Sequence, residues 1–205
     1  MKIKTMSSVA DVGTSNRKPA ALLDASQFIN HRYMVNLNDI SIRTDLKPGD
    51  LGNVVFLHGL LYSREYGYGL DFESFVAAGL HEFHSNYDPA KDRVWICEYK
   101  RRMIGFLLLM HRENNVAQLR YFLLEPEYRD LGLGKKLMQL YMDFFHQCGY
   151  KSLYLWTTHE LDAAAILYKR YGFKLTEEKT STVFGKPLKE QRYDLIIKEQ
   201  IEFSD

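Results

Sequence analysis

The chain has 205 residues, of which 46% are hydrophobic and 26% charged, and this balance fits one globular domain with a sizeable core. The 27 Lys and Arg residues nearly offset the 26 Asp and Glu residues, which leaves a formal net charge of +1. Because no strong overall field would hold nucleic acid or an anionic membrane, we expect any phosphate-bearing ligand to bind at a local site.

Residues 1–38 are predicted to form an N-terminal tail, with the folded domain at residues 39–205. The first 20 residues have weak apolar periodicity, and residues 1–17 contain no apolar signal-peptide region. After Gly105 the longest apolar run covers only residues 106–110, far short of the roughly 20 residues that cross a bilayer. These features predict a cytoplasmic protein without a membrane segment.

Strand and helix periods alternate from about residue 39 onward. A first strand near residues 40–46 is followed by amphipathic helices near residues 51–65 and 72–87, and the second helix ends before Pro89. Further strands are expected near residues 93–99, 103–111, 116–125, 153–157, 173–178 and 192–198, with helices near residues 133–148 and 161–171. The order β-α-α-β-β-β-α-β-α-β-β predicts a mixed α/β sheet with helices on both faces.

The segment most informative about chemistry covers residues 123–135, where a strand leads into a glycine-rich turn and then a helix. Glycines leave backbone N–H groups unobstructed, and the first turn of a helix adds free donors, so the element suits a pyrophosphate. Arg129 and Lys135 add local positive charge. The spacing matches neither GxGxxG nor GxxxxGK[ST], and the alternative is a turn that uses glycine only for a sharp bend.

The pattern Arg-x-x-Gly-x-Gly at residues 129–134, after a strand that ends in Leu-Glu-Pro, resembles the GNAT (Gcn5-related) N-acetyltransferase superfamily. The likeness covers roughly residues 40–200 and includes the segments at residues 153–157 and 165–173. Residues 58–67, 87–89, 92–96 and 117–120 are similar to the acetyltransferase domain often fused to MarR-type winged-helix regulators. The 38 residues before Asp39 are too few for a winged helix, so we expect no transcription-factor role.

The resemblance implies a GNAT-type fold with acetyl-CoA as co-substrate, bound in a V between the strand at residues 122–124 and the strand at residues 153–157. It further implies a bulge on the first strand that exposes backbone groups to the pantetheine arm. The coenzyme contacts it assigns are Phe122, Leu123, Leu124, Arg129, Asp130, Leu131, Gly132, Leu133, Gly134, Lys135 and Asp162. At Asp162 many relatives carry Asn, so this contact departs from the family pattern.

The resemblance also implies direct attack of an amine on the thioester, with Tyr168 facing the CoA sulfur; the alternative is a core tyrosine. An alkylammonium must first lose a proton, so a proton acceptor is needed nearby. The candidates are Glu125, Glu65 and His58. Alternatively, Glu125 is a solvated strand end, and Glu65 and His58 order the first helix. The Leu124 N–H is expected to hold the oxyanion.

Aromatic residues make up 14% of the chain, and three tyrosines, Tyr62, Tyr66 and Tyr68, lie close to Glu65. In this superfamily that segment caps the acceptor side, and a tyrosine wall with a carboxylate suits a cationic amine. The alternative is that these tyrosines pack the helix pair. Tyr62 and Tyr66 are therefore our candidates for substrate contacts.

We expect no metal, because His81 and His84 have i, i+3 spacing without a third ligand. Cys97 and Cys148 lack CxxC spacing, which favours buried free thiols. The predicted function is N-acetyl transfer to a small-molecule or peptide amine, with a homodimer left open. A non-catalytic acyl-CoA-binding sensor is the alternative, and nucleic acid is not an expected partner.

Overall fold

The computed structural model describes residues 35–197, so most of the predicted tail and the last part of the final predicted strand lie outside the described residues. The elements in chain order are η1 (Leu37–Asp39), β1 (Ser41–Arg43), α2 (Asp50–Tyr66), α3 (Leu70–Ser85), β2 (Arg93–Tyr99), β3 (Arg102–Arg112), η2 (Glu113–Asn115), β4 (Val116–Leu124), η3 (Pro126–Tyr128), α4 (Leu133–Gln147), β5 (Ser152–Thr158), α5 (Asp162–Arg170), β6 (Lys174–Ser181) and β7 (Leu188–Ile196). Apart from three short 3-10 turns, this is the predicted order.

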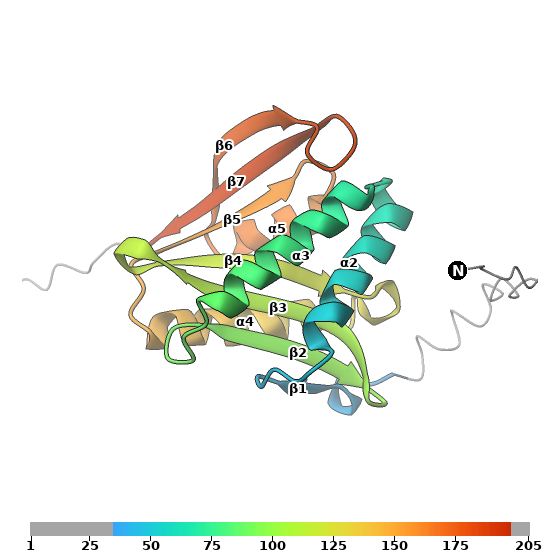
Figure 1. Cartoon of the computed structure of the whole chain (residues 1–205). Coiled ribbons are helices and arrows are strands. Elements are labelled where there is room, and N and C mark those ends of the chain that lie inside the picture. The colour runs from blue at the N-terminus through green and yellow to red at the C-terminus, as the bar shows by residue number, and fades with distance from the viewer. Residues whose placement is uncertain (1–34, 198–205) are drawn as a thin grey trace, which may run out of the picture.

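The strands form one seven-stranded sheet in the order β1-β2-β3-β4-β5-β7-β6. Among the described strands only β4 and β5 pair in parallel, and every other neighbouring pair is antiparallel. Helices α2 and α3 cover one face of the sheet and α4 and α5 cover the other (Figure 1). The mixed α/β sheet with helices on both faces is therefore confirmed.

Each face of the sheet has its own hydrophobic core, and the apolar stripes of the helices explain why. On α2 the buried residues include Val54, Leu57 and Leu61, which pack with α3 against one face of β2 and β3. On α4, Leu137 and Tyr141 belong to the core of the opposite face. Since apolar residues at spacings of three and four line one side of a helix, the sequence pattern placed these helices correctly.

The sheet splits between its two central strands. Strands β4 and β5 pair from Val116 with Ser152 to Leu119 with Leu155, and no pairing follows. Beyond that point β4 stays paired with β3, while β5 stays paired with β7 as far as Thr158. The two strands therefore open into the V that the sequence resemblance implied.

A β-bulge deforms β4 at the mouth of this V. Leu108 of β3 pairs with Arg120, whereas Phe106 pairs with Leu123, so two residues of β4 oppose one residue of β3. Tyr121, within the bulge, has a φ of +56°, an uncommon conformation for an aromatic residue and one that costs energy. The expected bulge is thus present, and it sets the directions of the side chains at residues 120–122.

Strand β7 begins at Leu188, four residues before the predicted start. Leu188 is buried against the α2 and α3 core, but Lys189, Glu190 and Gln191 hide the alternation that would reveal the strand. Cys97 and Cys148 are both free, the first buried and the second partly exposed. Within residues 35–197 no helix is long and apolar enough to cross a membrane, and no cluster of ligand-type side chains is arranged to hold a metal.

Candidate active site

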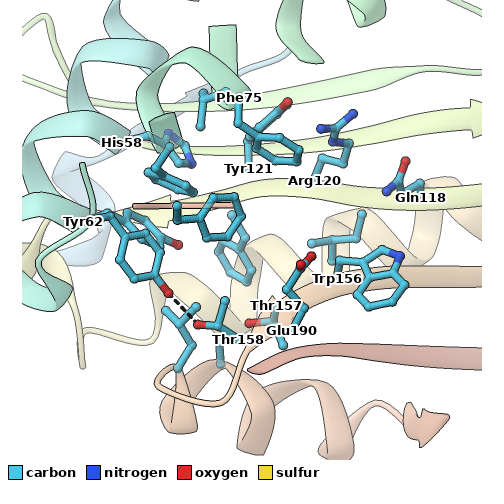
Figure 2. Close-up of a pocket in the computed structure, with 18 of the residues that line it drawn as sticks. His58, Tyr62, Phe75, Gln118, Arg120, Tyr121, Trp156, Thr157, Thr158 and Glu190 are labelled. Atoms are coloured by element: carbon cyan, nitrogen blue, oxygen red, sulfur yellow. Dashed lines mark hydrogen bonds between the residues drawn. The ribbon is translucent and has the colours of Figure 1, made fainter. Parts of the chain in front are cut away.

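Two cavities meet at the V between β4 and β5. The first, of about 340 Å³, lies among α2, α3, the bulge of β4 and the end of β5, and we call it the α3-side cavity (Figure 2). The second, of about 370 Å³, lies among the end of α2, the end of β4 and the starts of α4 and α5, and we call it the α4-side cavity. Both cavities are lined by Tyr62, Phe122, Leu161, Ala164 and Tyr168, so they adjoin at a common neck.

The α4-side cavity collects most of the residues expected to bind coenzyme. Phe122, Leu123, Leu124, Arg129, Asp130, Gly134 and Asp162 all line it. The remaining expected residues, Leu131, Gly132, Leu133 and Lys135, are not among its lining residues. The Leu133 side chain is buried in the core, so at this position only backbone groups are suited to meet a ligand, whereas Lys135 is exposed.

The start of α4 carries backbone donors without side-chain caps. Gly132 occupies the N-cap position with a φ of +85°, and no side chain caps the helix there. The turn of the helix closes with the Lys136 N–H donating to the Gly132 carbonyl at 3.1 Å. The N–H groups ahead of Lys136 therefore remain for an anionic ligand, which fits a pyrophosphate group.

Arg129 is held on three sides. Its Nε donates to the Leu124 carbonyl at 2.9 Å, while its two terminal nitrogens donate to the two carboxylate oxygens of Glu65 at 2.7 and 2.8 Å. Burial acts to lower the pKa of Arg129, but the hydrogen bonds and charge of Glu65 outweigh it and raise that pKa above its ordinary value. Glu65 thus lies in the α4-side cavity, engaged by Arg129, and the structure does not place it as a free proton acceptor.

Tyr168 lies at the neck, on the buried side of α5. Burial and the neighbouring Tyr62 hydroxyl both raise the pKa of Tyr168, so the phenol keeps its proton at neutral pH. The hydroxyl is therefore a neutral donor between the two cavities.

His58 lines the α3-side cavity from α2 and is 2% exposed. Its Nδ1 lies 2.8 Å from the Val54 carbonyl oxygen, which can only accept, so Nδ1 is the protonated nitrogen and Nε2 keeps a lone pair. Burial lowers the pKa of His58 to about 4. The imidazole ring stacks on Tyr62, with ring centroids 5.7 Å apart. His58 is thus a neutral proton acceptor next to the neck.

Glu125 is not brought to the site. It is 7% exposed and lines neither cavity, and its Oε1 accepts a hydrogen bond from Arg102 at 2.5 Å. Its other oxygen is buried without a partner in the described part of the chain. Glu125 is therefore not a solvated strand end but the buried half of an ion pair that ties the segment after β4 to Arg102 of β3.

The predicted tyrosine wall is divided between the cavities. Tyr62 lines both, and Tyr68 lines the α3-side cavity with its hydroxyl 2.8 Å from the Thr158 hydroxyl. Tyr66, the last residue of α2, lines the α4-side cavity and not the other one, and its ring packs on Tyr62 and Tyr68 with centroid distances of 5.4 and 5.9 Å. Tyr62 therefore borders both cavities and Tyr66 borders the α4-side cavity, and a contact of either with the acceptor stays a prediction.

Several residues of the α3-side cavity were missed by the sequence analysis. Phe184, from the loop between β6 and β7, packs on Tyr68 and Phe72, and its carbonyl accepts a hydrogen bond from the Gly69 N–H at 3.2 Å. Lys186 fixes the same loop by donating to the Tyr66 carbonyl and to Glu160. The other missed lining residues include Phe75, Gln118, Arg120, Trp156, Lys179 and Glu190. One signal was available: Arg120 places a charge inside a strand whose other residues are all uncharged.

Comparison with known proteins gives a consistent assignment. The sequence model of the Acetyltransferase (GNAT) family matches residues 57–173. The chain is 32% identical over 116 residues to the uncharacterized N-acetyltransferase YjgM of Escherichia coli K12, a match that covers 55% of this chain and 70% of that protein.

Solved structures show the same fold. A GNAT-family acetyltransferase from Staphylococcus aureus Mu50 superposes with a TM-score of 0.64 at 20% identity, covering 78% of this chain and 99% of that one. A spermidine N-acetyltransferase from Vibrio cholerae, solved with CoA and spermine, superposes with a TM-score of 0.58 at 19% identity over 78% of this chain and 96% of that one.

Proposed function

We propose that this chain, which belongs to the GNAT acetyltransferase family and is an acyltransferase, transfers an acetyl group where its two cavities adjoin. In this proposal acetyl-CoA binds in the α4-side cavity and a primary amine binds in the α3-side cavity. One observation carries this proposal: the two cavities share a neck that contains Tyr62, Phe122 and Tyr168. Since both cavities are lined by these residues, two substrates bound from opposite sides would meet at the neck.

The α4-side cavity suits the coenzyme for two reasons. The uncapped backbone donors at the start of α4 face an anion without any need for a side chain, and the helix dipole favours negative charge there. The β4 backbone at residues 122–124 also borders this cavity and, past the last pair with β5, has no strand beside it on that edge. An extended pantetheine arm would lie along this edge, as a peptide adds to an open sheet.

Acetyl-CoA supplies an electrophilic thioester carbonyl and a thiolate leaving group. The amine nitrogen forms the new bond to the acetyl carbon, and the bond from carbon to sulfur breaks. His58 Nε2 takes the proton that the amine loses, because Nδ1 is already committed to Val54. Tyr168 donates its hydroxyl proton to the departing sulfur and is reprotonated from solvent. The Leu124 N–H remains our proposed donor to the oxyanion.

Release of CoA from acetyl-CoA in the presence of a panel of primary amines and amino-terminal peptides tests this proposal. We expect turnover with at least one acceptor, and we expect His58→Gln to lower kcat by about 100-fold. If calorimetry instead shows tight acetyl-CoA binding with no turnover across a broad panel, the protein is a non-catalytic acyl-CoA sensor and the proposal is wrong.

A further inference from the structure

The bulge in β4 turns two consecutive side chains toward the same helix. Side chains of a regular strand alternate between faces, yet Arg120 and Tyr121 both reach α3. A Cβ atom at Gly79 of α3 would lie 2.0 Å from the Tyr121 hydroxyl and 2.5 Å from Arg120 Nη2. Both groups therefore occupy the space left by the missing side chain at Gly79.

Arg120 brings positive charge into the α3-side cavity. Its side chain is only 12% exposed, and its Nη1 donates to Glu82 at 3.2 Å. Glu82 is also bound by Arg112, so two guanidinium groups share one carboxylate. Within residues 35–197 Glu82 is the sole carboxylate paired with Arg120, and the three groups together carry one net positive charge. The guanidinium also lies 4.8 Å from the centre of the Tyr121 ring and 5.6 Å from that of Phe75, but neither ring carries a full negative charge. A largely buried guanidinium that shares its one carboxylate with a second arginine favours an anionic ligand.

Gln118 strengthens this donor character at the same end of the cavity. Its side-chain oxygen accepts hydrogen bonds from Arg112 at 2.9 and 2.6 Å, which leaves its NH₂ group to serve as a donor. Gln118 and Arg120 lie across the cavity from Tyr62, the neck residue, in Figure 2. The donors are therefore grouped away from the neck.

Glu190, the acidic residue among those that line the α3-side cavity, has a cation of the same wall, Lys179, beside it. Glu190 lies 3.8 Å from Lys179, whose ammonium also sits 4.4 Å from the centre of the Trp156 ring. Glu65 belongs to the other cavity and is bound by Arg129. The rest of the α3-side wall is mainly aromatic, with contributions from Phe72, Phe75, Phe122 and Phe184. This surface offers little to the second cationic group of a polyamine.

We propose that the acceptor amine also carries a carboxylate, which Arg120 holds at the end of the α3-side cavity while the amine points to the neck. The planar fork of a guanidinium matches a carboxylate in two parallel hydrogen bonds, and the aromatic wall covers the apolar part that joins the two groups. This inference rests on the proposed function, since it names the class of acceptor used at the same site.

Matched pairs of acceptors test it. Each pair has one amine with a carboxylate and one without: ω-amino acids of increasing length against alkylamines, and aromatic amino acids against their decarboxylated amines. The variants are Arg120→Gln, Arg120→Lys and, as a control, Arg192→Gln, which removes a cation bound to Asp194 outside both cavities. Thermal unfolding of each variant accompanies the kinetics.

We expect the wild-type kcat/KM to favour the carboxylate member of at least one pair by about 10-fold or more, because a site built to bind a charged group rejects a partner that lacks it. Arg120→Gln should lower kcat/KM for that acid by about 10- to 100-fold and leave its matched amine within about threefold. Arg120→Lys should fall between, and Arg192→Gln should match wild type.

Equal or better use of the member without a carboxylate in every pair overturns the inference, as does an Arg120→Gln variant that folds normally and loses both members of a pair equally. If Arg120→Gln does not fold, the inference is judged on two other results: the kcat/KM preference of the wild type within each pair, and the kcat/KM values of Arg120→Lys. Should no amine be acetylated at all, the proposed function fails by itself. In that case the inference is tested by titrating the same acids into the CoA-saturated protein. Binding to the wild type that is weaker in Arg120→Lys supports the inference, and the absence of binding overturns it.

Discussion

Arg129 and Glu65 form a two-pronged ion pair that joins the coenzyme-side turn to the end of α2, with both N–O distances below 3 Å. The pair has two consequences. It fixes the guanidinium whose Nε also holds the Leu124 carbonyl, and it occupies both oxygens of a carboxylate that would otherwise be a candidate proton acceptor. We therefore expect Glu65 to position Arg129 and not to move a proton.

Glu65→Gln should leave kcat within about threefold of wild type, because the chemistry does not use this carboxylate. The KM for acetyl-CoA should change instead, since Arg129 loses its counter-charge beside the coenzyme. Because both partners are partly exposed, the loss of unfolding free energy should be about 1 kcal/mol or less. Steady-state kinetics and chemical denaturation measure these quantities.

Glu178→Gln is the matched control for this change, because Glu178 pairs with Lys189 on the surface and lines neither cavity. It should alter neither kcat nor the KM for acetyl-CoA. If Glu65→Gln folds normally and yet lowers kcat by about 100-fold, as loss of a general base does, Glu65 is the proton acceptor and our assignment is refuted.

Tyr168→Phe should lower kcat by about 100-fold and leave the KM for acetyl-CoA nearly unchanged, because it removes one proton donor and keeps the ring. Burial raises the pKa of Tyr168, so the lost group is a neutral phenol throughout the neutral pH range. Tyr141→Phe provides the comparison: its hydroxyl is also buried and has no partner in the described part of the chain, but it lines neither cavity. Equal kinetic losses in both variants would show a packing effect.

The stability of the fold should depend on pH through His58. Its pKa is about 4 in the folded protein, below the 6.5 of an ordinary histidine, so between these values the unfolded chain binds more protons. The stabilising contribution is complete above pH 6.5 and is lost as the pH falls toward 4, by about 3 kcal/mol in total. Urea denaturation of wild type and His58→Gln over this range measures it, and parallel pH profiles would contradict the assignment.

The sequence predicts a structural feature correctly when the residues that determine it lie within one segment of the chain. Helix α2 and strand β2 were found because their apolar periods are complete within one segment. The glycine-rich turn before α4 was found for the same reason, since its backbone donors are contiguous. Each of these features needs no distant residue for its shape.

The parts that were missed depend on tertiary contacts. Glu125 was interpreted as a proton acceptor or a solvated strand end, and its ion pair was missed because Arg102 comes from the neighbouring strand. The α3-side cavity joins Phe72 of α3 to Phe184 of the β6–β7 loop, and no local pattern links them. The direction of Arg120 depends on a bulge whose register is set by pairing with β3.

Gly79→Ala tests whether this geometry serves the acceptor. The new methyl group would overlap the Tyr121 hydroxyl and Arg120 Nη2, which are the movable ends of long side chains, so the fold should survive with a loss of about 1–3 kcal/mol while both groups are displaced. For the best acceptor of the panel we expect kcat/KM to fall by at least about 10-fold, with the KM for acetyl-CoA within twofold of wild type. Gly52→Ala, on α2 with no atom within 4 Å of the added carbon, should instead stabilise the helix by up to about 1 kcal/mol and keep wild-type kinetics. Unchanged acceptor kinetics in a folded Gly79→Ala protein would mean that the positions of Arg120 and Tyr121 do not govern acceptor binding.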